Sequence, residues 1–85
     1  MKTSEILAHY ERHHGKKVAD PTRLSVILRH LAWFGSMTIA DVSLDAQERY
    51  SSARNVAPAT IRRELGTLVS AFNFAVKTRL ITRDQ

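Results

Sequence analysis

The chain contains no cysteine, so neither a disulfide framework nor a thiolate zinc site is possible. We therefore expect the protein to work in the reducing cytoplasm. Its longest uninterrupted apolar runs are only a few residues, which is too short for a helix that crosses a membrane. The segment after Met1 carries Glu5 and Glu11 in an amphipathic pattern and lacks the apolar core of a secretory signal.

Signals for strands and for enzyme sites are also missing from the sequence. No segment alternates between polar and apolar residues, and hairpin dipeptides such as Asn-Gly are absent. There is no glycine-rich loop that could bind phosphate and no pair of carboxylates spaced for general acid–base catalysis. We therefore expect no cofactor. His9 and His13 are spaced like two zinc ligands on a helix, but no third ligand follows nearby, and we expect no metal. Tyr10 and Tyr50 lack an activating group that would make either a nucleophile.

The sequence does contain four segments with helical periodicity and helix start signals. Those start signals are Thr3 or Ser4, Asp20-Pro21, Ser43 and Pro58. They predict helices over about residues 4–14, 21–34, 44–54 and 58–80. A length of 85 residues allows one domain, 1–85, with a single modest core. The sequence therefore predicts an all-α fold, a compact four-helix bundle with short connections.

The last predicted helix, 58–80, organises the rest of the chain because its two sides differ. We expect its buried stripe to consist of Ile61, Leu65, Leu68, Val69, Phe72 and Val76. Roughly opposite lie Arg63, Gly66, Thr67, Ser70, Phe74 and Lys77, with Arg62 and Asn73 on one shoulder. Short polar and basic side chains can approach phosphates and base edges closely. This helix is thus predicted to anchor the core and to offer a surface to nucleic acid.

The charge balance supports an anionic partner. The formal net charge is +5 at pH 7, and the segment from Pro58 to Gln85 contains five basic residues and only two acidic ones.

Gly66 has no side chain and so allows another group to approach the helix backbone closely. The sequence slightly favours a packed helix over DNA as that group.

Several runs of residues resemble one known family. They are Asp20-Pro21-Thr22-Arg23-Leu24, Leu31-Ala32-Trp33-Phe34-Gly35, Thr38-Ile39-Ala40-Asp41-Val42, Tyr50 with Arg54, and above all Pro58 to Leu68 followed by Ala71-Phe72-Asn73 and Ala75-Val76. In order and spacing these runs look like the N-terminal core-binding domain of the tyrosine recombinases, the phage-integrase family. The similarity covers nearly the whole chain, and the run from Pro58 is its most specific part.

The resemblance implies a SAM-like four-helix bundle that clamps duplex DNA together with a separate catalytic domain. In that family the second and fourth helices of the small domain face the DNA. The catalytic domain supplies an arginine, a lysine, a His-x-x-Arg pair, a further histidine or tryptophan and the tyrosine nucleophile. Because Gln85 falls about where the linker to that domain would begin, we expect a fragment without enzymatic activity. The letters His-x-x-Arg at His9 to Arg12 lie on the first helix, where the family has no catalytic group.

The expected partners are double-stranded DNA, the catalytic domain and other recombinase protomers on DNA, with no membrane contact and a monomeric state in isolation. The candidate DNA-binding residues of the last helix are Arg62, Arg63, Thr67, Ser70, Asn73 and Lys77. Among them, Arg63 and Lys77 are suited to phosphates, and Asn73 and Thr67 to base edges. Second-tier candidates outside this helix are Arg23, Arg29, Lys16 and Lys17.

Three other interpretations stay open at this point. In the first interpretation, the basic face of the last predicted helix is an ordinary solvated surface. In the second, the chain is a protein-interaction module that presents Trp33 and Phe74, although packing of both against neighbouring helices is favoured. In the third, it is a stand-alone repressor, but the link between the third and fourth helices lacks the expected glycine turn.

Overall fold

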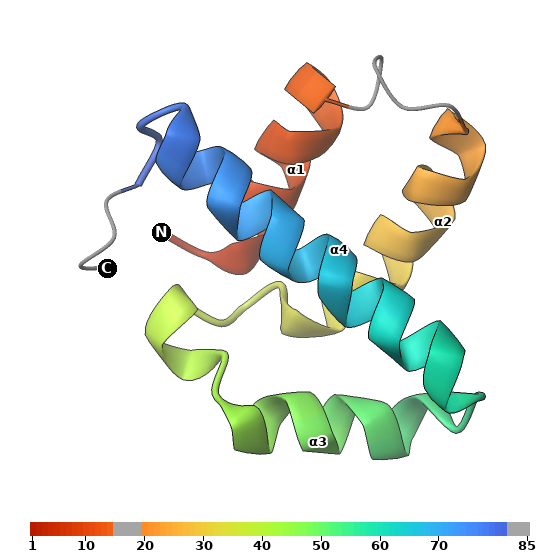
Figure 1. Cartoon of the computed structure of the whole chain (residues 1–85). Helices are drawn as coiled ribbons and strands as arrows, with labels where there is room; N and C mark the ends of the chain where they lie inside the picture. Colours follow the sequence, from red (N-terminus) through yellow and green to blue (C-terminus); the bar gives the residue numbers. More distant parts are fainter. Residues whose placement is uncertain (15–19, 82–85) are drawn as a thin grey trace.

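The computed structural model describes residues 1–14 and 20–81, and within them it confirms an all-α, four-helix architecture (Figure 1). The helices are α1 (Thr3–His14), α2 (Pro21–Leu31), α3 (Leu44–Arg54) and α4 (Pro58–Lys77). Two short 3₁₀ helices, η2 (Ala32–Phe34) and η3 (Ile39–Asp41), join α2 to α3. The only strand-like pairing among the described residues is an isolated bridge between Lys2 and Thr38.

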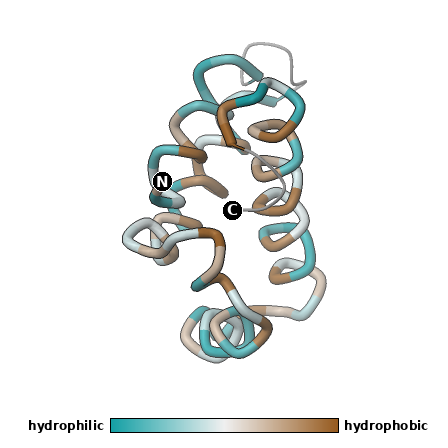
Figure 2. Tube along the Cα trace, turned by 90° about the vertical axis from the view of Figure 1, so that its left-hand side faces the viewer, coloured by the Kyte–Doolittle hydropathy of each residue, from teal (hydrophilic) through white to brown (hydrophobic). Residues whose placement is uncertain are grey.

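Helix α4 is the longest element and lies across one side of α1 and α2 (Figures 1 and 2). Helix α3 packs against α4 from below, near the start of α4. Each of the three other helices therefore contacts α4, and the core forms where they meet. Its largest fully buried side chains are those of Tyr50, Phe34, Ile6, Leu31 and Leu68.

The helix boundaries follow the start signals closely. The Asp20 carboxylate accepts a hydrogen bond from the Arg23 N–H at 3.0 Å, and the Ser43 hydroxyl accepts one from the Ala46 N–H at 3.2 Å. The predicted helix 21–34 tightens into η2 over its last three residues. The predicted helix 58–80 ends earlier, at Lys77, because Arg79 takes a left-handed conformation with φ 63°.

The first helix begins differently from the prediction. Thr3 is a fully buried residue inside α1 and not a cap. Its N–H and its hydroxyl both donate to the Met37 carbonyl oxygen, at 2.7 and 2.9 Å. These bonds satisfy the buried polar atoms of Thr3 and tie the N-terminus to the connection between η2 and η3.

The predicted buried stripe of α4 is confirmed at Ile61 and Leu68 but is rotated about the helix axis at its other positions. The buried residues are Ile61, Glu64, Leu68, Ala71 and Ala75. Val69, expected inside, is 54% exposed, and three other members of the predicted stripe are only half-buried: Leu65, Phe72 and Val76. Two fully buried alanines allow the neighbouring helices to come close, and periodicity of large apolar residues does not detect them.

Helix α3 buries little of its surface, and Leu44 at its start is 71% exposed. The buried residues of α3 are Ala46 and Tyr50.

A buried polar cluster joins α3 to α4. Glu64 of α4 is 3% exposed, and its carboxylate accepts hydrogen bonds from the Tyr50 hydroxyl at 2.7 Å and from Arg54 Nε and Nη2 at 3.0 and 2.7 Å. The bonds from Arg54 lower the pKa of Glu64, although burial opposes them. Burial, with help from Glu64, raises the pKa of Tyr50. The cluster compensates the cost of taking a carboxylate out of water.

We expect Arg54→Met to destabilise the fold, because the carboxylate of Glu64 would keep only Tyr50 as a partner. Leaving this buried carboxylate without its cationic partner should lower the free energy of unfolding by about 2 kcal/mol or more. The matched control is Arg49→Met, which breaks the exposed pair of Arg49 with Asp45 and costs less than about 0.5 kcal/mol. Urea denaturation of both variants checks this. Equal losses would show that the cluster does not hold α3 to α4.

The same cluster predicts a pH dependence. Because the pKa of Glu64 is lower in the folded state, its contribution is present above the ordinary value of 4.5 and is lost as the pH falls through the lowered value. Glu64→Gln should therefore be less stable than the parent at pH 7, and the difference should shrink below pH 4.5. Glu48→Gln makes the same substitution at an exposed position and serves as the control. A Glu64→Gln difference that stays constant across this range contradicts the assignment.

Candidate nucleic-acid interface

The side of α4 turned away from the core forms a continuous exposed surface. We call it the outer face, and it consists of Arg62, Arg63, Gly66, Val69, Ser70, Asn73 and Lys77, all of them exposed. No described segment lies over this side of α4 in Figure 1 or Figure 2. The exposure predicted for Arg63, Ser70 and Lys77 is confirmed.

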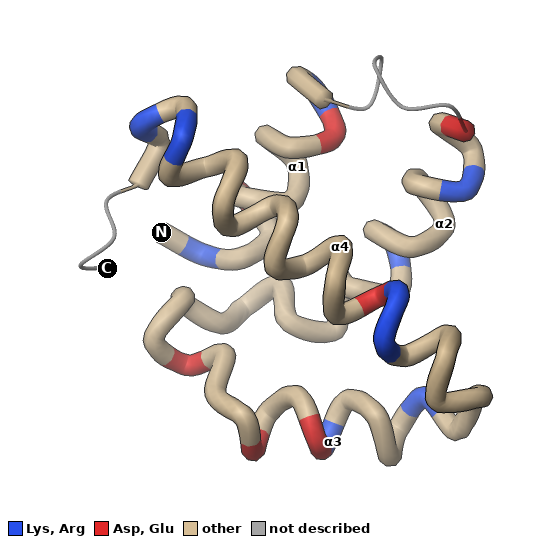
Figure 3. Tube along the Cα trace, viewed as in Figure 1, with Lys and Arg blue, Asp and Glu red and all other residues tan. Residues whose placement is uncertain are grey.

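Charge on the outer face is confined to its two ends (Figure 3). Arg62 and Arg63 lie near the start of α4 and Lys77 is its last residue, with no charged residue between Leu65 and Val76. Arg63 and Lys77 are separated by about 21 Å along the axis at 1.5 Å per residue. The one acidic residue of α4 is Glu64, which is buried and paired with Arg54. The outer face is therefore cationic at both ends and uncharged in the middle.

Gly66 leaves an open space at the middle of the outer face. A Cβ built at this position meets no atom of the described residues within 4 Å beyond the backbone of α4 itself, so packing of a neighbouring helix, the slightly favoured explanation from the sequence, is wrong. Glycine inside a helix lowers stability by about 0.5–1 kcal/mol relative to alanine. Among the described residues, no contact at Gly66 requires a glycine and so offsets this loss.

Two residues expected on the outer face lie instead on its shoulder. Thr67 is half-buried, and its hydroxyl donates to the Arg63 carbonyl oxygen at 3.0 Å, which leaves only the oxygen to accept a further bond. Phe74 packs against α1, with ring centroids 5.4 Å from His9 and 5.6 Å from Tyr10. The packing that the sequence favoured for Phe74 is confirmed.

A hollow borders the C-terminal half of the outer face. It lies between α1 and α4 and is lined by Tyr10, His14, Ser70, Asn73, Phe74 and Lys77. The His14 ring stacks on Tyr10 with centroids 4.8 Å apart. The sequence did not indicate α1 as a border of this surface, because the contact joins residues about sixty positions apart.

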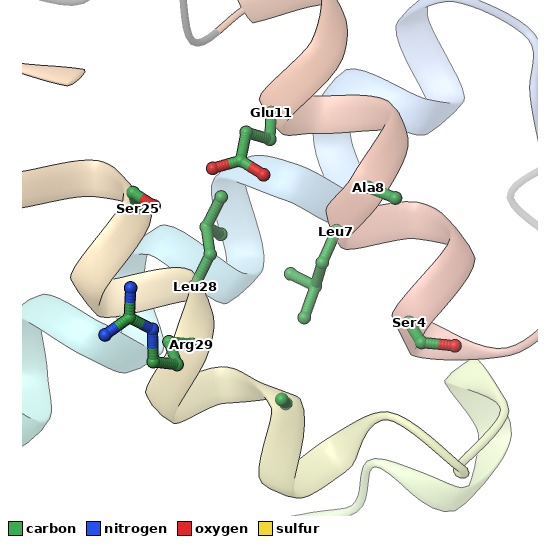
Figure 4. A pocket seen from close by; sticks show the side chains of 8 residues that line it. Ser4, Leu7, Ala8, Glu11, Ser25, Leu28 and Arg29 are labelled. Atoms are coloured by element: carbon green, nitrogen blue, oxygen red, sulfur yellow. The ribbon is translucent and has the colours of Figure 1, made fainter. Parts of the chain in front are cut away.

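The candidates on α2 do not join the outer face. Arg29 lines a groove between α1 and α2 together with Glu11, over a floor that includes Leu7 and Leu28 (Figure 4). In Figure 4 the α4 ribbon passes behind α1 and α2, so this groove opens on their other side. Arg23 is exposed in the first turn of α2. Lys16 and Lys17 lie outside the described residues.

The histidines near the end of α1 form an aromatic cluster. The His9 and His13 rings lie 4.7 Å apart, and His9 Nε2 is 2.9 Å from the Thr78 hydroxyl oxygen. Burial and the neighbouring His13 and Arg12 lower the pKa of His9. Within residues 1–14 and 20–81, no group of three His, Cys, Asp or Glu side chains is placed to hold a metal ion.

Trp33 is the main aromatic side chain that stays accessible. It is 40% exposed, while its ring forms T-shaped pairs with Phe34 and Tyr50 at centroid distances of 4.9 and 5.5 Å. The packing favoured from the sequence is therefore confirmed, although part of the side chain stays exposed.

In comparisons with known proteins, no family model, curated protein or solved structure matches the chain. Among the described residues, no helix combines the length and apolar character needed to cross a membrane.

Proposed function

We propose that the protein is a duplex-DNA-binding module that docks the outer face of α4 in or across the major groove. The observation that carries this proposal is the arrangement of charge on that face, with cations at both ends and small uncharged residues between them. The only acidic side chain of the helix is buried, so it does not repel a polyanion.

The dimensions of α4 fit this mode of docking. The major groove of B-DNA is about 12 Å wide, and the two cationic ends of the outer face are about 21 Å apart. A helix laid across the groove therefore brings Arg62 and Arg63 to one phosphate wall and Lys77 to the other. Gly66, Ser70 and Asn73 then lie over the base edges, where the Asn73 amide can pair with adenine.

The hollow between α1 and α4 extends this surface on one side. His14 lies beside Ser70, Asn73 and Lys77, so a phosphate held by Lys77 would also be near the end of α1. In this proposal the interface uses α1 and α4, whereas the tyrosine-recombinase resemblance implies α2 and α4. That resemblance supports DNA as the partner. As part of the same proposal, the bound module positions a separate catalytic domain for strand exchange.

A protein-interaction module is the second candidate function, and partial exposure of Trp33 is the observation that favours it. Its second predicted contact, Phe74, is half-buried against α1, which reduces the apolar surface available to a partner. On this view charge reversal on α4 would have little effect, and Trp33→Ala would weaken association with the partner.

The charge of the outer face supplies the first test. We expect Arg63→Glu and Lys77→Glu each to weaken binding to a 20-base-pair duplex about tenfold or more at low salt, because each replaces a phosphate contact with a repulsion. The affinity of the parent should also fall markedly with salt. A plot of the logarithm of the binding constant against the logarithm of the salt concentration should have a slope of about −0.9 for each phosphate contacted. Fluorescence anisotropy titrations at two ionic strengths measure both effects.

Arg49→Glu is the matched control, since it makes the same change in net charge on exposed α3. It should weaken binding far less than either α4 variant. If all three variants lose affinity equally, binding depends on overall charge and the outer face has no special role.

Gly66 supplies a second test in which stability and binding move in opposite directions. Gly66→Ala should stabilise the free protein by about 0.5–1 kcal/mol, because nothing lies near the added methyl group. The same methyl group should weaken DNA binding, because it holds the α4 backbone away from the base edges. Thermal denaturation and duplex titration of one preparation measure the two effects. A variant that is more stable and binds as tightly as the parent would contradict close approach at Gly66.

A further inference from the structure

Val69 is the exposed apolar side chain at the centre of the outer face. It is 54% exposed, although the sequence pattern placed it in the core. It follows Arg63 by six residues and precedes Lys77 by eight, which places it about 9 and 12 Å from them along the axis. Val69 thus lies near the midpoint between the two cationic ends.

The surroundings of Val69 leave its isopropyl group open to a partner. Gly66 and Asn73, three residues before and four after, are its exposed neighbours on the helix surface. Within residues 1–14 and 20–81, no side chain lies within 4 Å of a Cβ built at Gly66, so none shields Val69 from that direction. Among the described residues, the other large exposed apolar side chains lie on different elements: Met1 before α1, Val26 on α2, Trp33 on η2, Leu44 on α3 and Val56 in the connection before α4.

One group on the floor of the major groove matches such a side chain. Each base pair presents hydrogen-bonding atoms there, and thymine alone adds an apolar group, its 5-methyl. Removing the valine side chain from water lowers the free energy only when it packs against an apolar group. Ser70 and Asn73, its polar neighbours, can satisfy the hydrogen-bonding atoms of adjacent bases.

We propose that Val69 packs against a thymine 5-methyl group when α4 lies in the major groove, and so gives the module a preference for thymine at that position. This inference rests on the proposed DNA-binding function. It adds a specificity-determining residue to a surface that otherwise binds through phosphates and polar contacts.

The test compares two A·T-rich duplexes of one sequence, one with thymine and one with deoxyuridine, which lacks the 5-methyl group. The parent, Val69→Ser and the control Val56→Ser are each titrated with both duplexes, so that the variants form a double-mutant cycle with the methyl group. Burial of one methyl group should make the parent bind the thymine duplex about fourfold more tightly. This ratio should fall to about one in Val69→Ser and persist in Val56→Ser.

The outcomes separate this inference from the function on which it rests. A parent that binds both duplexes equally, or a Val69→Ser variant that keeps the thymine preference, overturns the role of Val69 and leaves DNA binding intact. A parent that binds neither duplex overturns the DNA-binding proposal and this inference with it. Because Val69 is exposed, circular dichroism should show Val69→Ser folded like the parent.

Discussion

Burial of the Glu64 carboxylate fixes the rotation of α4, and the position of the proposed DNA-binding surface follows from that rotation. A carboxylate out of water is tolerated only where charged or polar partners meet it, and Tyr50 and Arg54 of α3 provide those partners. Once Glu64 faces α3, the small residues Ala71 and Ala75 turn toward the other helices. The opposite side of the helix is then the one left open to solvent.

The same constraint removes the acidic charge of α4 from its exposed side. Three cations remain there, separated by a run of uncharged residues, and this pattern suits a helix that spans a groove between two phosphate backbones. Stability and proposed function are thus linked, because the interaction that holds α3 to α4 also clears the outer face of negative charge. Gly66 and Val69 fit this view, since neither is explained by packing within the described residues.

Much of the fold was predictable from local signals, because caps and prolines act within a few residues. The starts of α2, α3 and α4 follow Asp20-Pro21, Ser43 and Pro58 as expected. The rotation of α4 was not predictable, since it depends on Glu64 meeting residues 10 and 14 positions earlier in the chain. Alanines that are fully buried also carry little weight in a hydrophobic pattern. The exposure of the α4 cations Arg62, Arg63 and Lys77 was predicted correctly, whereas the exposure of Val69 and the hollow beside His14 required the tertiary structure.

The most direct test of DNA docking by the outer face is a map of backbone amide chemical shifts during titration with duplex DNA. The account predicts that shifts concentrate on α4 at Gly66, Ser70, Asn73 and Lys77, extend to His14 on α1, and leave the exposed residues of α3 unchanged. Shifts that cluster around Trp33 instead, or that spread evenly over all basic residues, would contradict it.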